Sequence, residues 1–151
     1  MQHKLIEDEN GWATVVAIVD AGDEAVSCLT DAARAHDLSA ASVTGVGAVE
    51  HATVGWYDLD RQEYEQIEVD EQAELLSLVG DVARGPDGSV ALHAHVVLGL
   101  RTGETRGGHL LEATVRPTLE AVFRQSPAQL RKTFRPEFGL ALIDLDQSTE
   151  D

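Results

Sequence analysis

Two apolar runs separated by a short polar turn restrict the fold of this chain more than any other feature. The first run, SVALHAHVVLGL, covers residues 89–100, and the second, TRGGHLLEA, covers residues 105–113. The intervening RTGE segment combines a glycine with polar residues, which is typical of a tight turn. Two runs of this length joined by such a turn predict an antiparallel β-hairpin.

Three of the six histidines lie in this predicted hairpin. His93 and His95 are two residues apart, so their side chains point to the same side of the strand. A three-residue loop over residues 101–103 would place His95 directly opposite His109, whereas a two-residue loop would shift the pairing by one residue. A bulge at the glycine pair before His109 would correct that shift. In either case three imidazoles can converge on one point.

Three neutral imidazoles form a ligand set for a divalent metal ion. Zinc binds histidine nitrogens at about 2.0–2.1 Å, and three protein ligands leave a fourth tetrahedral position open. Nickel, cobalt or iron fit the same set less selectively. A bound ion would also satisfy ring nitrogens placed in an otherwise apolar strand. In the alternative interpretation His93 faces solvent, His95 bonds a backbone carbonyl, and the Gly-Gly-His segment is only a bulge.

Acidic residues elsewhere in the chain are candidates for catalysis beside a zinc-bound water. Glu74 and Glu112 are the preferred candidates for a general base, and Glu120 is a further one. The alternative for each is an ordinary surface or hydrogen-bonding carboxylate. The sequence has no nucleophile-elbow, phosphate-loop or dinucleotide-binding motif.

The rest of the chain predicts an α+β domain with one early helix and seven or eight strands. Residues 24–37 have the three-to-four spacing of an amphipathic helix, with Asp23 as its N-cap and Val26, Leu29, Ala33 and His36 on one face. Residues 114–127 are ambiguous between helix and strand. The remaining predicted strands cover residues 14–19, 41–49, 50–59, 63–70, 74–83 and a buried segment at 138–145.

This pattern is expected to form a single domain, residues 1–151, with a core from about 11 to 146 and flexible termini that include His3. The helix would cover one face of a mainly antiparallel sheet. The opposite face also needs cover, and self-association is the usual solution for a domain of this size.

Composition supports a cytoplasmic protein with a hydrophobic core. The chain has 151 residues, of which 43% are apolar, but no run approaches the roughly 18–20 apolar residues of a membrane helix. The acidic N-terminus is unlike a secretory signal. The single cysteine, Cys28, excludes an internal disulfide and a cysteine-based zinc site, and it is expected to be a small core residue.

The charge balance is strongly acidic, with 27 Asp and Glu against 11 Lys and Arg and a net charge of −16. Such a surface predicts a halophilic protein, because concentrated salt screens the repulsion between carboxylates; an acidic mesophilic protein is the alternative. The same charge argues against direct nucleic-acid binding, which depends on basic residues that neutralise phosphates. The densest basic segment, residues 124–135, is interpreted as solvated surface or a contact between subunits.

These segments together resemble one known family. The GDE turn followed by a helix, the segment VTGVGAVEHATVGWYD, the strand ELLSLVGDVA, the histidine hairpin and the closing FGLALIDL are similar, in this order, to the PPC (plants and prokaryotes conserved) domain. The resemblance covers about residues 11–146. Its most specific part is the H-x-H…G-G-H-L pattern, formed here by His93, His95, Gly107, Gly108, His109 and Leu110.

The resemblance implies an α+β domain that assembles as a homotrimer and binds a metal ion, with zinc as first choice, through His93, His95 and His109. Plant members join this domain to AT-hooks, short basic Arg-Gly-Arg segments that enter the DNA minor groove, and prokaryotic relatives are often labelled DNA-binding by that association. This sequence contains no such segment. We therefore expect a metal-binding trimer with a binding or regulatory role. A zinc-dependent hydrolase or lyase and a DNA-associated regulator are the alternatives.

Overall fold

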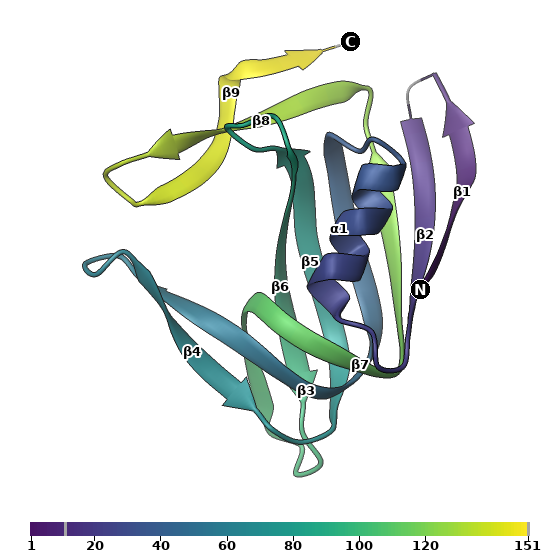
Figure 1. The fold of residues 1–151 in the computed structure, drawn as a ribbon, viewed down its shortest axis with the longest axis vertical. Coiled ribbons are helices and arrows are strands. Elements are labelled where there is room, and N and C mark those ends of the chain that lie inside the picture. The colour runs from purple at the N-terminus through teal and green to yellow at the C-terminus, as the bar shows by residue number, and fades with distance from the viewer. Residues whose placement is uncertain (11, 151) are drawn as a thin grey trace.

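The computed structural model describes residues 1–10 and 12–150, which form one α-helix and nine β-strands of a single sheet (Figure 1). The elements, in chain order, are β1 (Gln2–Glu9), β2 (Trp12–Asp20), α1 (Ala25–Ala35), β3 (Ala40–Asp58), β4 (Glu63–Val69), β5 (Ala73–Arg84), β6 (Val90–Gly99), β7 (Thr105–Gln125), β8 (Ala128–Arg135) and β9 (Leu140–Glu150).

The sheet is almost entirely antiparallel. Its main path has the strand order β1-β2-β7-β3-β5-β8-β9, while β4 pairs with β3 and β6 pairs with both β5 and β7. Within the described ranges, the one parallel pairing joins Arg84 of β5 to Arg131 of β8. A single helix on a mainly antiparallel sheet confirms the predicted α+β class.

The two longest strands, β3 and β7, run beside each other through the middle of the sheet. The sequence suggested two strands over residues 41–59, but the structure has one continuous strand, β3. Its pairing with β5 shifts between Gly45 and Gly47, so the strand is irregular there but does not end. A Cβ at Gly47 would lie 2.3 Å from the Thr118 carbonyl oxygen. The glycines therefore allow close approach of β7 instead of terminating β3.

The ambiguous segment, residues 114–127, mostly forms the second half of β7. Pro117 lies where the ladders are interrupted, because pairing with β3 stops at Val115 and resumes at Leu119. Pairing with β2 begins at Thr118. Proline has no backbone N–H to donate, so at this position it removes no ladder hydrogen bond.

The N-cap of helix α1 lies one residue after the predicted cap. The N-cap is Glu24, whose carboxylate accepts hydrogen bonds from the backbone N–H groups of Val26 (2.9 Å) and Ser27 (2.7 Å). The predicted cap, Asp23, was wrong, because its carboxylate instead pairs with the Met1 amino group at 2.7 Å. The helix buries Ala25, Leu29, Ala32 and Ala33. Val26 and His36, which the sequence placed on this face, are only partly buried.

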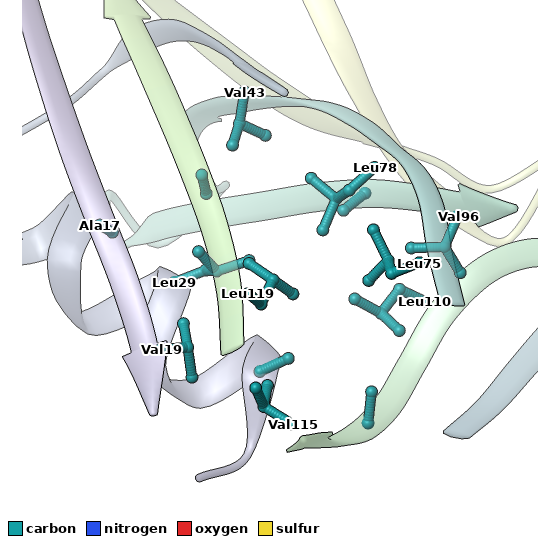
Figure 2. Packing of buried hydrophobic residues seen from close by; sticks show 14 of the residues in the cluster. Ala17, Val19, Leu29, Val43, Leu75, Leu78, Val96, Leu110, Val115 and Leu119 are labelled. Carbon is teal, nitrogen blue, oxygen red and sulfur yellow. The ribbon is translucent and has the colours of Figure 1, made fainter. Parts of the chain in front are cut away.

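The hydrophobic core lies between α1 and the inner side of the sheet. Figure 2 shows Leu29 of α1 pointing into the same cluster as Val19 of β2 and Leu119 of β7. Phe123 is the largest side chain of this cluster that is fully buried. Cys28 packs at its edge and is half-buried, in partial agreement with its predicted place in the core.

Residues near both ends of the described chain, which were expected to be flexible, lie within strands: β1 begins at Gln2 and β9 ends at Glu150. His3 belongs to β1 and pairs with Ala17 of β2. At the other end β9 pairs with β8 at the edge of the sheet. The sequence predicted a buried strand at 138–145, but Leu142 and Leu145 are 40% and 77% exposed. An edge strand has one neighbour, so its apolar side chains receive less cover than those of a central strand.

Candidate metal centre

The β6–β7 hairpin has the three-residue loop that was one of the two sequence alternatives. The Leu100 N–H donates to the Glu104 carbonyl at 2.8 Å, which leaves residues 101–103 as the loop. His95 therefore pairs directly with His109. No bulge at the glycine pair is needed to bring the imidazoles together.

The glycine pair, Gly107 and Gly108, instead allows β7 to lie close to both neighbouring strands, β6 and β3. A Cβ at Gly107 would lie 2.8 Å from the Val96 carbonyl oxygen of β6. A Cβ at Gly108 would lie 2.6 Å from the Gly55 carbonyl oxygen of β3. Side chains at these two positions would push the strands apart next to His109.

The three imidazoles converge on one point at the surface. The Nε2 atoms of His93 and His95 are 3.1 Å apart, and one ring nitrogen from each of the three histidines lies within 4.8 Å of the others. Two ligands of a tetrahedral ion at about 2.0–2.1 Å are about 3.3 Å apart. The histidine cluster (His93, His95 and His109) thus has the size and donor type for one divalent transition-metal ion.

An aspartate that was not among the predicted site residues orients the first histidine. Asp81 Oδ2 lies 2.9 Å from His93 Nδ1. A carboxylate at this distance accepts the Nδ1 proton, so the neutral ring keeps its lone pair on Nε2, which faces His95. A carboxylate that fixes the tautomer of a ligating histidine is a recurring feature of zinc sites. Asp81 lies directly opposite His93 in the β5–β6 ladder. Predicting this contact would have required the register between β5 and β6, which the local sequence does not give.

The third histidine is held as a neutral base. The His109 ring stacks on Tyr64 with 4.8 Å between ring centroids. Burial, followed by the neighbouring His93, His95 and Lys132, lowers the pKa of His109 to about 4. Burial and His93 also lower the pKa of His95. Metal binding requires unprotonated imidazoles, so both rings are in the form that binds an ion at neutral pH.

His109 also carries a buried ring nitrogen that lacks a hydrogen bond. Its Nδ1 atom has no partner among the protein groups in the described part of the chain. A buried polar atom without a partner costs free energy. A bound ion or ligand that engages the ring offsets part of this cost, which supports the fit of a metal to the cluster.

A buried ion pair lies next to the cluster. Lys132 Nζ is 3.0 Å from Asp81 Oδ1, and the lysine side chain is only 9% exposed. Burial alone would raise the pKa of Asp81, but the hydrogen bonds from His93 and Lys132 outweigh it and hold the pKa below its ordinary value. The interpretation of this basic segment as solvated surface was therefore wrong for Lys132.

A cavity of about 460 Å³ opens beside the cluster. His93 and His109 of the cluster line it, and so do Lys132 and Tyr64. The remaining lining residues are Asp81, Ala91, Leu92, Leu140, Ala141, Leu142 and Ile143.

The acids selected from the sequence lie elsewhere in the sheet. Glu74 is paired with Ala48 and Gly99. Glu112 pairs with Thr53, and Glu120 pairs with Val46 and Ile18. All three side chains are exposed, and none lines the cavity beside the histidines.

The other histidines are also separate from this cluster. His51 Nε2 lies 3.0 Å from the Thr114 hydroxyl. The rings of His3 and His36 contact each other, with 2.9 Å between His3 Nδ1 and His36 Nε2. The described residues include no helix that is long and apolar enough to cross a membrane.

Solved structures of several other proteins share this fold. A candidate DNA-binding protein from Bacteroides thetaiotaomicron aligns with a TM-score of 0.84 at 22% identity, over 96% of this chain and 99% of its own. A plant- and prokaryote-conserved (PPC) protein from Pyrococcus horikoshii aligns with a TM-score of 0.81 at 26% identity, over 95% and 94%. A metal-containing protein from Archaeoglobus fulgidus aligns with a TM-score of 0.79 at 32% identity, over 87% and 92%.

Sequence comparison identifies the family directly. No curated protein sequence matches the chain. The model of the Plants and Prokaryotes Conserved (PCC) domain matches residues 7–126, well over half of the chain. This match confirms the resemblance found in the sequence, and the chain belongs to the Plants and Prokaryotes Conserved domain family.

Proposed function

We propose that the protein binds one zinc ion per subunit through His93, His95 and His109. The observation that carries this proposal is the convergence of three imidazole nitrogens within 4.8 Å, with His93 oriented by Asp81. The relative from Archaeoglobus fulgidus, which is called metal-containing, supports it. The bound ion would supply a positive charge and a centre that can accept a further ligand.

The test is metal content after replacement of one ligand. We expect about one zinc per chain in the wild type and a loss of most of it in His95→Ala. His95 is exposed, so this variant is expected to fold. His51→Ala is the matched control, because His51 is an exposed histidine of the same sheet outside the cluster. Stoichiometric metal in purified His95→Ala would show that the assigned ligands are wrong.

We further propose that the protein is a homotrimer. Apolar side chains are exposed around the cluster on the outward side of the sheet. Val79 is directly opposite His95 and 52% exposed, and Val97 follows two residues after it and is 42% exposed. Val46 and Leu76 are 57% and 53% exposed and line a common hollow. Analytical ultracentrifugation should give three times the mass of 16.3 kDa, and Val97→Asp should reduce it. A monomeric wild type would refute the proposal.

The physiological role that fits these features is a binding or regulatory module. A zinc-dependent hydrolase or lyase needs a general base that can reach the substrate. Among the described residues, Asp81 is the one carboxylate that lines the cavity; its Oδ2 contacts His93 and its Oδ1 forms an ion pair with Lys132. The geometry therefore favours binding over hydrolysis.

Direct DNA contact is not part of this proposal. A net charge of −16 opposes association with a polyanion, although a structural neighbour is named as a candidate DNA-binding protein. An electrophoretic mobility shift at low salt tests the point, since electrostatic binding is strongest there. A shift that disappears as salt rises would reinstate the DNA-associated alternative.

The same charge leads us to propose that the protein works in the salt-rich cytoplasm of a halophile. Repulsion among 27 acidic residues falls when the Debye length decreases from about 10 Å at 0.1 M salt to about 3 Å at 1 M. The free energy of unfolding should therefore rise between these KCl concentrations, as measured by urea denaturation. Equal stability at both concentrations would favour an acidic mesophilic protein.

A further inference from the structure

The cavity beside the histidine cluster is lined in part by two hairpins that touch at their tips. One is the β3–β4 hairpin and the other is the β8–β9 hairpin, and both project from the same side of the molecule (Figure 1). The Tyr57 hydroxyl donates to the Phe138 carbonyl oxygen at 2.7 Å. The Gln62 side-chain amide donates to the Pro136 carbonyl oxygen at 3.0 Å. These contacts fix the distance between the walls, so the cavity is a structured feature of the fold.

The lining of this cavity is divided by chemistry. One wall is the apolar start of β9, Leu140–Ile143, and Ala91 and Leu92 continue the apolar surface. The polar part of the lining, called the polar end below, is a connected set: Asp81 Oδ2 lies 2.9 Å from His93 Nδ1, Asp81 Oδ1 lies 3.0 Å from Lys132 Nζ, and the His93 and His109 ring centroids are 5.3 Å apart. A volume of about 460 Å³ lies within the range of roughly 300–1,000 Å³ that small-molecule sites occupy.

The charges at the polar end do not balance once a divalent ion is bound. Without metal, the carboxylate of Asp81 and the ammonium of Lys132 neutralise each other. A divalent cation adds two positive charges to a partly desolvated site, where the attraction to an anion is stronger than in bulk water. Lys132 is 9% exposed and forms an ion pair with Asp81, and because its ammonium has three donors it can also donate to a ligand.

We propose that this cavity binds a small monocarboxylate with a short apolar tail, its carboxylate on the metal beside Lys132 and its tail along Leu140–Ile143. This inference rests on the proposed metal site. The mostly apolar lining selects a ligand with one compact charged group. Inorganic phosphate has more acceptor oxygens than the donors at the polar end can satisfy, and it has no apolar part to bury.

The experiment uses cobalt as a spectroscopic substitute for zinc. Cobalt uptake by the full chain is measured first, by metal analysis and visible absorption. The loaded protein is then titrated with hexanoate, acetate, 1-hexanol and inorganic phosphate. Hexanoate should perturb the cobalt absorption bands and bind at least about tenfold more tightly than acetate, because each buried methylene contributes roughly a factor of four. Hexanol and phosphate should leave the bands unchanged at the same concentrations.

A pair of matched variants locates the tail. Leu142→Glu places a carboxylate on the cavity wall at a residue that is 40% exposed, so it should weaken hexanoate binding at least about tenfold while cobalt uptake is kept. Leu145→Glu makes the same change on the same strand at a residue that is 77% exposed and outside the cavity lining, and it should bind hexanoate like the wild type.

The outcomes separate the two proposals. Failure of the wild type to take up cobalt would refute the metal site and with it this inference. Normal cobalt uptake with equal affinity for hexanoate and acetate, with preference for phosphate, or with no effect of Leu142→Glu would overturn the carboxylate proposal and leave the metal site standing.

Discussion

Acidification of the metal-free protein should destabilise it over a pH range set by His109. The ordinary pKa of a histidine is 6.5, and that of His109 in the folded protein is about 4. Below pH 6.5 the unfolded chain binds a proton at this residue while the folded protein does not, so the free energy of unfolding decreases as the pH falls. The decrease is complete just below pH 4, where the folded protein also becomes protonated.

The structure also sets the size of this effect. A pKa that falls from 6.5 to about 4 corresponds to at most about 3.4 kcal/mol, at 1.36 kcal/mol for each pH unit. The ring is only half-buried, and water screens part of the interaction. We therefore expect a loss of about 1–2 kcal/mol between pH 7 and pH 4 from His109 alone.

The assay is urea denaturation at several pH values in the presence of a chelator and at constant salt. The comparison protein is His109→Gln, which does not titrate in this range. Other groups with lowered pKa values, among them His95 and Asp81, are present in both proteins, so the difference between the two pH profiles reports on His109. Parallel profiles for wild type and variant would show that His109 is not held as a neutral base, and would refute the reasoning.

Three further predictions follow from individual contacts. Asp81→Asn removes the carboxylate that fixes the His93 tautomer, so zinc affinity measured by competition with a chromophoric chelator should fall about 10- to 100-fold; unchanged affinity would mean that Asp81 serves only Lys132. Glu24→Ala removes the N-cap of α1 and should lower the free energy of unfolding by about 1 kcal/mol, whereas Glu24→Asn should retain most of it. Phe123→Ala empties a fully buried site and should cost about 3–5 kcal/mol in urea denaturation; a loss below about 1 kcal/mol would contradict the core packing described above.

Local sequence patterns were sufficient for most of the fold. The hairpin around residues 101–103 was predicted with its register as one of two alternatives, because turn chemistry and strand alternation are properties of neighbouring residues. The glycines of β3 were misleading, since glycine both ends strands and allows close packing. Only the tertiary contact between Gly47 and the Thr118 backbone shows that this glycine allows close packing and does not end the strand.

The candidate site was predictable only in part, because local patterns do not show which residues of distant strands meet. His93, His95 and His109 share one hairpin, so their convergence could be worked out from residue spacing. Asp81 and Lys132 lie on other strands, and the carboxylates predicted from the sequence were Glu74 and Glu112 instead. Charge and residue type alone do not distinguish a carboxylate that faces an imidazole from one that faces water.

The sequence by itself determined the strand pattern, the acidic surface and three histidines on one hairpin, because each depends on composition or on short-range periodicity. The tertiary structure decided which groups surround those histidines. Asp81 on β5, Lys132 on β8 and Tyr64 on β4 meet the hairpin only when the sheet is assembled. The cavity beside them likewise requires two hairpins, distant in sequence, to meet at their tips. Those contacts arise from long-range pairing of strands, and no local pattern encodes them.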